Sequence, residues 1–169
     1  MSSENLPQHV LVRKLVDQRA EISGQVASSK LQRVSHHVID LSGIEAILGF
    51  DRDENRKENI FVRVTASVSQ ECQRCLTPVQ FSLSVASKLI VVAHDDEARN
   101  LSRDCETIIL DQGELDIPAL IEEEILLALP IVPLHGMSQP AVEPTAKLVA
   151  SEAVGVVIKE LLSDGVSCE

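Results

Sequence analysis

The chain's most informative segment is Val68-Ser-Gln-Glu-Cys-Gln-Arg-Cys-Leu-Thr-Pro-Val79, in which a Cys-x-x-Cys pair separates two alternating patterns. Apolar residues occupy every second position before it, in 60–68, and again after it, in 79–85. Alternation with period 2 on both sides of a short break that contains proline predicts a β-hairpin with one buried face. Cys72 and Cys75 therefore lie on the predicted hairpin turn.

Two thiols on a hairpin turn are half of a zinc-ribbon site, because a structural zinc ion takes four ligands. The other cysteines, Cys105 and Cys168, stand alone, and the five histidines offer no second pair with metal spacing. Cys72 and Cys75 are thus the only metal candidates, and a monomer would add at most one imidazole. The sequence favours an ordinary turn without a cofactor over bound zinc, and predicts less than one equivalent of zinc in the purified protein.

A thiol–disulfide oxidoreductase is the disfavoured alternative for the same pair. That chemistry requires the first cysteine at a helix N-terminus, where the helix dipole lowers the thiol pKa, whereas this pair lies between two strands. An ordinary pKa of about 8.5 for both thiols would argue further against it. The sequence also contains no Gly-x-Ser-x-Gly, no phosphate-binding glycine loop and no His-Glu-x-x-His, so we expect no enzymatic activity.

Length and composition favour one folded domain. The chain has 169 residues, of which 44% are apolar, enough for a packed core without disulfides. The N-terminus lacks the basic and apolar regions of a signal peptide, and the longest apolar run, 125–134, contains two prolines and is too short to cross a bilayer. We expect a cytoplasmic protein with no membrane partner, a domain in 1–136 and an acidic tail in 137–169; the sequence leaves the oligomeric state open.

Charge is segregated along the chain. Residues 1–103 contain 13 basic and 13 acidic residues, whereas 104–169 contain two basic and 13 acidic residues, so the last third carries the whole net charge of −11. Phosphate binding needs a cationic surface, and the acidic third should instead attract basic partners, although simple solubility explains it equally well. Aromatic stacking of RNA bases is not expected, because the three phenylalanines lie in strand patterns. The candidate cations for RNA are Arg13, Lys14, Arg19, Lys30, Arg33, Arg52, Arg56 and Lys57.

The remaining elements complete an α+β fold. Asp116 as N-cap, Pro118 in the first turn and Pro130 as terminator define one long helix. Three consecutive glutamates in it, 122–124, point in different directions around the helix and are predicted to be a solvated face rather than a metal or base cluster. Together these patterns predict an antiparallel β-sheet meander with the Cys-x-x-Cys hairpin turn, flanked by N-terminal helices and this acidic C-terminal helix. The further elements expected are helices in 8–20 and after Ser28 or Ser29, strands in 38–50, 88–93 and 105–110, polar loops in 51–59 and 94–100, and a short helix in 146–162 of the tail.

Two segments together resemble the YceD family of large ribosomal RNA subunit accumulation proteins. They are Glu-Cys-Gln-Arg-Cys at 71–75 and, some 40 residues later, the acidic helix that runs into Leu-Pro-x-x-Pro-x-His at 129–135. The resemblance implies a non-enzymatic ribosome biogenesis factor for normal accumulation or processing of large-subunit (23S) rRNA, with a pre-50S particle or 23S rRNA precursor as partner. The charge pattern suggests an alternative, an acidic binding module for a basic ribosomal protein. The motif residues are Glu71, Cys72, Arg74, Cys75, Glu122, Glu123, Glu124, Pro130, Pro133 and His135.

One departure from the family pattern concerns metal. Members of the family commonly carry further cysteines just after the Leu-Pro-x-x-Pro-x-His segment, whereas here that place reads Gly-Met-Ser-Gln-Pro-Ala-Val-Glu at 136–143. The second half of a zinc ribbon is therefore missing from the position where the resemblance would put it.

Overall fold

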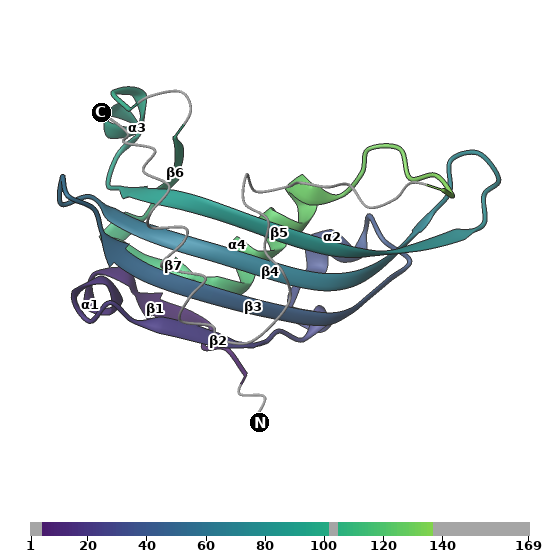
Figure 1. The fold of residues 1–169 in the computed structure, drawn as a ribbon, viewed down its shortest axis with the longest axis horizontal. Coiled ribbons are helices and arrows are strands. Elements are labelled where there is room, and N and C mark those ends of the chain that lie inside the picture. Colours follow the sequence, from purple (N-terminus) through teal and green to yellow (C-terminus); the bar gives the residue numbers. More distant parts are fainter. Residues whose placement is uncertain (1–4, 102–104, 137–169) are drawn as a thin grey trace.

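The hairpin predicted around the Cys-x-x-Cys segment forms the centre of the sheet (Figure 1). The structure, a computed structural model, describes residues 5–101 and 105–136. The hairpin strands are β4 and β5, and their alternation is confirmed, since the facing pair Val64 and Val85 is buried and the next pair, Thr65 and Ser84, is exposed. The elements in chain order are β1 (His9–Leu11), α1 (Val12–Asp17), β2 (Glu21–Gln25), η1 (Ser28–Lys30), α2 (Gln32–Ser35), β3 (Asp40–Arg52), β4 (Glu58–Glu71), β5 (Pro78–Val92), α3 (Asp95–Arg99), β6 (Glu106–Ile109), η2 (Asp111–Gly113), β7 (Glu114–Asp116) and α4 (Ile117–Ala128).

The main sheet has the strand order β2-β3-β4-β5-β6, and neighbouring strands are antiparallel except for the last pair. The predicted antiparallel meander is therefore correct for β2 to β5 and wrong for β6, which runs parallel to β5. The chain between them passes through α3 and comes back alongside β5 only as far as Leu89, so β6 pairs with the last four residues of β5. A second sheet of two short strands, β1 and β7, had not been predicted.

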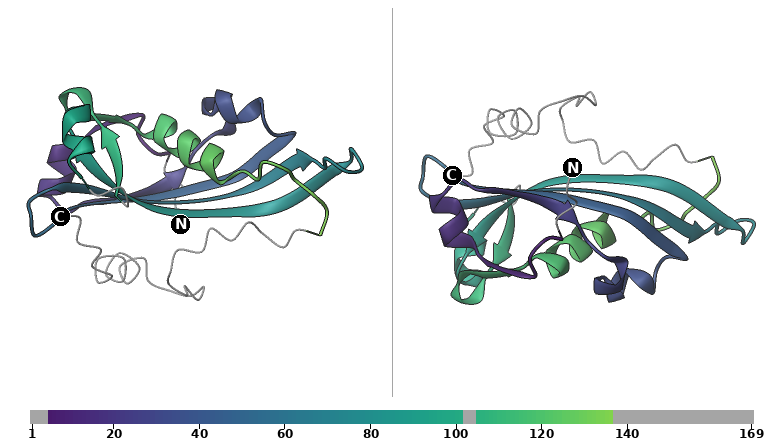
Figure 2. Two further views of the ribbon diagram at one scale, coloured as in Figure 1. Left: turned by 90° about the horizontal axis from the view of Figure 1, so that it is seen from above. Right: turned by 90° about the horizontal axis from the view of Figure 1, so that it is seen from below.

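The apolar core lies between the sheet and helices on one of its faces (Figure 2). Helix α1 contacts β3, while α4 contacts β4 and β5. Val12 and Val16 of α1 and Ile121 and Ile125 of α4 are buried in one cluster with the inward side chains of the strands. The 3.6-residue spacing of these apolar positions explains why one face of each helix is covered.

Three local predictions need correction. The helix expected in 8–20 extends only over Val12–Asp17, because β1 pairs with β7 and the chain turns at Arg19, whose φ is 47°. The polar loop expected in 94–100 is the helix α3, in which Arg99 pairs with Asp95 at 2.6 Å. The loop expected in 51–59 is shorter and covers only 53–57, since β3 continues to Arg52 and β4 begins at Glu58.

The predicted boundaries of α4 are confirmed. The Asp116 side chain accepts a hydrogen bond from the Ala119 N–H at 3.1 Å, as an N-cap does. Leu129 ends the helix with extended angles, φ −64° and ψ 135°, as expected for a residue before proline. The tail 137–169, with its expected helix in 146–162, lies outside the described residues. Among the helices described, none is long and apolar enough to span a membrane.

Candidate functional site

The β4–β5 turn holds the two thiols in a tight hydrogen-bonded loop. The Cys72 N–H donates to the Thr77 carbonyl at 3.0 Å, and the Leu76 N–H donates to the Cys72 carbonyl at 2.9 Å. Leu76 has a φ of 59°, in the left-handed region, which lets the chain reverse directly after Cys75. As a result the Cys72 side chain is buried and that of Cys75 is exposed.

The segment after α4 brings His135 to these thiols. The Gln73 N–H donates to the carbonyl of the buried Pro133 at 3.0 Å, which fixes this segment against the hairpin turn. His135 Nδ1 then lies 3.3 Å from Cys75 Sγ, and its Nε2 lies 3.2 Å from the Pro78 carbonyl oxygen. Figure 1 shows this segment, at the green end of the colour scale, running beside the tip of the hairpin.

The three side chains can serve as ligands of one metal ion. The sulfurs of Cys72 and Cys75 and a ring nitrogen of His135 all lie within 4.8 Å of one another. We call these three residues the Cys-His cluster. The sequence predicted at most one imidazole beside the two thiols, and the structure supplies that imidazole from a residue of the family-like motif.

The Cys72 thiol has a lowered pKa. Hydrogen bonds from the backbone N–H groups of Arg74 and Cys75 to the sulfur, together with a smaller contribution from His135, lower the pKa of Cys72 to about 6. This lowered pKa removes one argument against thiol–disulfide chemistry. Burial supplies a different argument against that chemistry. A reactive cysteine has to be partially exposed, and here the thiol with the lowered pKa is the buried one.

A groove of about 470 Å³ lies beside the Cys-His cluster, between the hairpin and the C-terminal end of α4. Exposed apolar side chains adjoin it: Ile131, in its lining, is 98% exposed, and Leu76, in the hairpin turn, is 67% exposed. The groove and these exposed apolar side chains together are a candidate interaction surface. The groove is lined by His37, Gln70, Glu71, Gln73, Leu126, Leu129, Pro130, Ile131 and Pro133.

The three glutamates of α4 do not form a solvated face, and that prediction is wrong for two of them. Glu122 and Glu124 are only 7% and 6% exposed, and only Glu123 is exposed to solvent. Helix α4 contacts the sheet on one side and α2 on another, so little of its surface is left for water. Burial raises the pKa of Glu124, and the nearby carboxylates of Glu106 and Glu123 raise it further.

Glu122 has a structural partner far away in the sequence. Its carboxylate oxygen Oε1 accepts hydrogen bonds from the backbone N–H groups of Arg33, at 2.5 Å, and Val34, at 3.2 Å. These N–H groups belong to the first turn of α2, whose N-cap residue Leu31 provides no side-chain hydrogen bond. Glu122 therefore caps α2 from α4.

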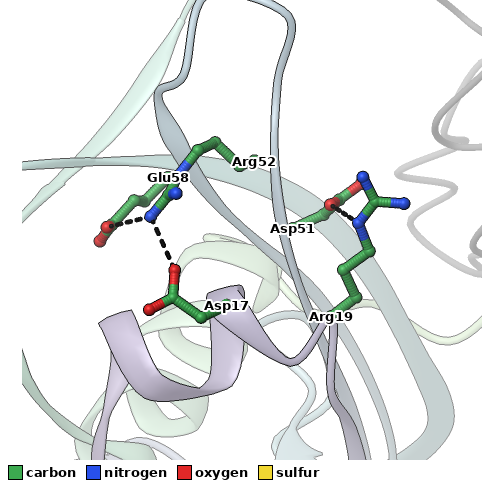
Figure 3. A network of polar contacts seen from close by, with 5 residues as sticks. All are labelled: Asp17, Arg19, Asp51, Arg52 and Glu58. Carbon is green, nitrogen blue, oxygen red and sulfur yellow. Dashed lines mark hydrogen bonds and ion pairs between the residues drawn. The ribbon is translucent and has the colours of Figure 1, made fainter.

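Two of the cations considered for RNA binding are held in ion pairs at the β3–β4 turn (Figure 3). Arg52 Nη2 lies 3.1 Å from both Asp17 and Glu58, and Arg19 Nε lies 3.4 Å from Asp51. These pairs join α1 and the start of β2 to the turn between β3 and β4. The paired carboxylates offset the positive charge that a phosphate would need at this end of the molecule.

The comparisons with known proteins agree with the motifs. The family model described as large ribosomal RNA subunit accumulation protein YceD matches residues 61–155, more than half of the chain. The chain belongs to the YceD family. A curated YceD relative, the large ribosomal RNA subunit accumulation protein of Haemophilus influenzae, is 32% identical over 137 residues, which are 80% of this chain and 79% of the relative. No solved structure matches the chain.

The YceD motif residues fall into two groups in space. One group gathers at the tip of the hairpin and the adjoining groove: Glu71, Cys72, Arg74, Cys75, Pro130, Pro133 and His135. The other group, Glu122 to Glu124, lies on α4, and Glu122 caps the N-terminus of α2. Sequence reasoning missed the carbonyls of Pro78 and Pro133, which position His135 and its segment, because a backbone group leaves no signal in a sequence.

Proposed function

We propose that this protein is a non-enzymatic ribosome biogenesis factor required for normal accumulation of 23S rRNA. Its direct partner is a pre-50S particle or a 23S rRNA precursor. The protein contacts this partner through the hairpin tip, which comprises the Cys-His cluster, the groove and the exposed apolar residues Leu76 and Ile131. The name of the Haemophilus influenzae relative supports the coarse role, and the location of the motif residues supports the surface.

One observation carries the assignment of the surface. The motif segments 71–75 and 129–135 are far apart in the chain, and Cys75 and His135, separated by 60 positions, meet at one exposed end of the molecule. A motif that served only the core would be buried throughout, whereas Arg74, Cys75 and His135 are exposed. Exposed groups that converge from two segments are typical of a binding surface.

Deletion of the gene tests the role directly. We expect the ratio of 23S to 16S rRNA to fall and the 50S peak in a sucrose gradient to shrink, because large subunits would not accumulate normally. A plasmid copy of the full chain should restore both. An unchanged ratio together with a normal 50S peak in the deletion strain would refute the proposal.

The acidic binding module remains a second candidate, although fewer of its carboxylates are exposed than the three glutamates of α4 suggested. Glu106, Glu114 and Glu123 are exposed and could attract a basic ribosomal protein, whereas Glu122 and Glu124 are buried. A pull-down at low salt with Glu123→Gln against the unchanged protein separates the two candidates. Capture of a basic ribosomal protein that Glu123→Gln weakens favours the module, and capture of RNA by both proteins favours the proposal above.

A further inference from the structure

We propose that the Cys-His cluster is a zinc site with three protein ligands and a fourth position open to solvent. Its ligands are the sulfurs of Cys72 and Cys75 and Nδ1 of His135. Such a site leaves one coordination position for water or another ligand, whereas a closed four-ligand site does not. Zinc binding does not depend on the ribosomal role, so each can be tested without the other.

The spacing of the donor atoms fits a tetrahedral metal ion. Zinc bonds of about 2.3 Å to sulfur and about 2.0–2.1 Å to nitrogen set sulfur and nitrogen ligands roughly 3.6 Å apart. Cys75 Sγ and His135 Nδ1 lie 3.3 Å apart, and the three donor atoms of the cluster all lie within 4.8 Å of one another. A metal ion can therefore enter when the side chains move by about 1 Å or less, which rotation about their own bonds supplies.

The tautomer of His135 is already the one that a metal needs. A carbonyl oxygen only accepts hydrogen bonds, so the ring proton lies on Nε2, which donates to the Pro78 carbonyl at 3.2 Å. The lone pair therefore lies on Nδ1, the atom that faces Cys75 Sγ. A histidine that ligates a metal almost always donates its other N–H to a carbonyl or carboxylate in this way.

The nature of the donors selects zinc over harder cations. Two thiolates and one imidazole suit zinc, whereas magnesium and calcium prefer oxygen ligands. The Cys72 sulfur is buried at the turn, where the backbone hydrogen bonds of Cys72 with Thr77 and Leu76 fix its position. Cys75 and His135 are exposed, so the fourth position faces solvent. Within residues 5–101 and 105–136, no fourth cysteine, histidine or carboxylate belongs to the cluster.

The same Cys75–His135 pair has a rival interpretation as a nucleophilic cysteine with its general base. In that chemistry the imidazole activates a single thiol, and a second thiol has no role. Here Cys72 lies within the same 4.8 Å as the pair, and its own backbone hydrogen bonds hold it there. The second sulfur favours metal binding, and thiol reactivity in the experiment below separates the two interpretations.

Titration with cobalt and then zinc tests the proposal on the reduced, chelator-treated full chain. We expect one equivalent of Co²⁺ to give a sulfur-to-cobalt charge-transfer band and the intense d–d bands of a tetrahedral site, and Zn²⁺ to abolish both. Cys75→Ser and His135→Ala should each weaken binding by more than the roughly 10–100-fold that loss of an outer-shell partner costs. His36→Ala is the matched control, because His36 is exposed and lies outside the cluster, and it should bind like the unchanged protein.

Circular dichroism of each variant shows whether it is folded; because both Cys75 and His135 are exposed, folding should persist. Absence of the charge-transfer band in the unchanged protein would overturn the proposal. So would bands of full strength in Cys75→Ser, since the metal would then lie elsewhere. Rapid alkylation of Cys75 by iodoacetamide that one equivalent of Zn²⁺ does not slow would favour the nucleophile instead.

Discussion

Replacement of Glu122 by alanine should destabilise the protein far more than its place in a run of three glutamates suggests. The Glu122 carboxylate is 7% exposed and accepts hydrogen bonds from the N–H groups of Arg33 and Val34. Alanine would leave both donors without an acceptor. Each unsatisfied buried donor costs about 1–3 kcal/mol, and because water can reach the partly buried Arg33 N–H, we expect a total of about 2–4 kcal/mol.

Two further variants separate the hydrogen bonds from the loss of side-chain volume. Glu122→Gln keeps an acceptor oxygen but loses its charge, and since charge-assisted hydrogen bonds are about twice as strong as neutral ones, it should cost roughly half as much. Glu123→Ala removes an exposed carboxylate from the adjacent position and should change stability by no more than about 0.5 kcal/mol. Urea unfolding of the four proteins measures these differences in free energy.

Amide hydrogen exchange provides the local measurement. In Glu122→Ala the amide protons of Arg33 and Val34 should exchange faster than in the unchanged protein, because they have lost their acceptor. The exchange rates of amides in the centre of β4 should change only as much as the change in global stability requires. If Glu122→Ala unfolds at the same urea concentration as Glu123→Ala, and the two amides keep their protection, the assignment of Glu122 as the cap of α2 is wrong.

Three other changes test separate parts of the structure. Glu124→Gln should be as stable as the unchanged protein at about pH 4 and more stable at pH 7. The folded-state pKa of Glu124 is raised above its ordinary 4.5, so the unchanged protein loses stability as this carboxyl ionises. Urea unfolding across this pH range measures the difference, and a gain of the unchanged protein over the variant as the pH rises would contradict the assignment. Asp116→Ala removes the N-cap of α4 and should cost about 0.5–2 kcal/mol in thermal or urea unfolding, and an unaltered midpoint would show that the Ala119 N–H needs no side-chain partner. Changing Cys72 and Cys75 together to serine in metal-free protein should cost no more than about 1–2 kcal/mol, since the sheet and helices supply the stability; failure of that variant to fold would show that the thiols are structural.

Patterns confined to one element made the hairpin and α4 predictable. The alternation around Val64 and Val85 specifies strands with one buried face wherever the hairpin is placed. The N-cap Asp116 and the terminator Pro130 act within a few residues of themselves, so they define the ends of α4 from the sequence alone. Elements of three residues, such as β1 and β7, are too short to show a period and become strands only by pairing with each other.

Contacts between distant segments could not be predicted. The burial of Glu122 depends on N–H groups 88 and 89 positions away, and nothing in the helical pattern of 117–129 indicates that α2 lies above it. The approach of His135 to Cys75 across 60 positions depends on the bond between Gln73 and Pro133, which joins two backbones. The parallel pairing of β6 likewise follows from the path of the chain through α3, which the apolar pattern of 105–110 does not specify.

The ratio of 23S to 16S rRNA in a rescued deletion strain tests the central claim most directly. The strain would carry as its only copy either the unchanged gene, the Cys75→Ser and His135→Ala double variant, or the His36→Ala control, each at equal protein level. We predict that the unchanged gene and His36→Ala restore the ratio and that the double variant leaves it as low as in the deletion. Full restoration by the double variant would contradict the claim that the hairpin tip is the functional surface.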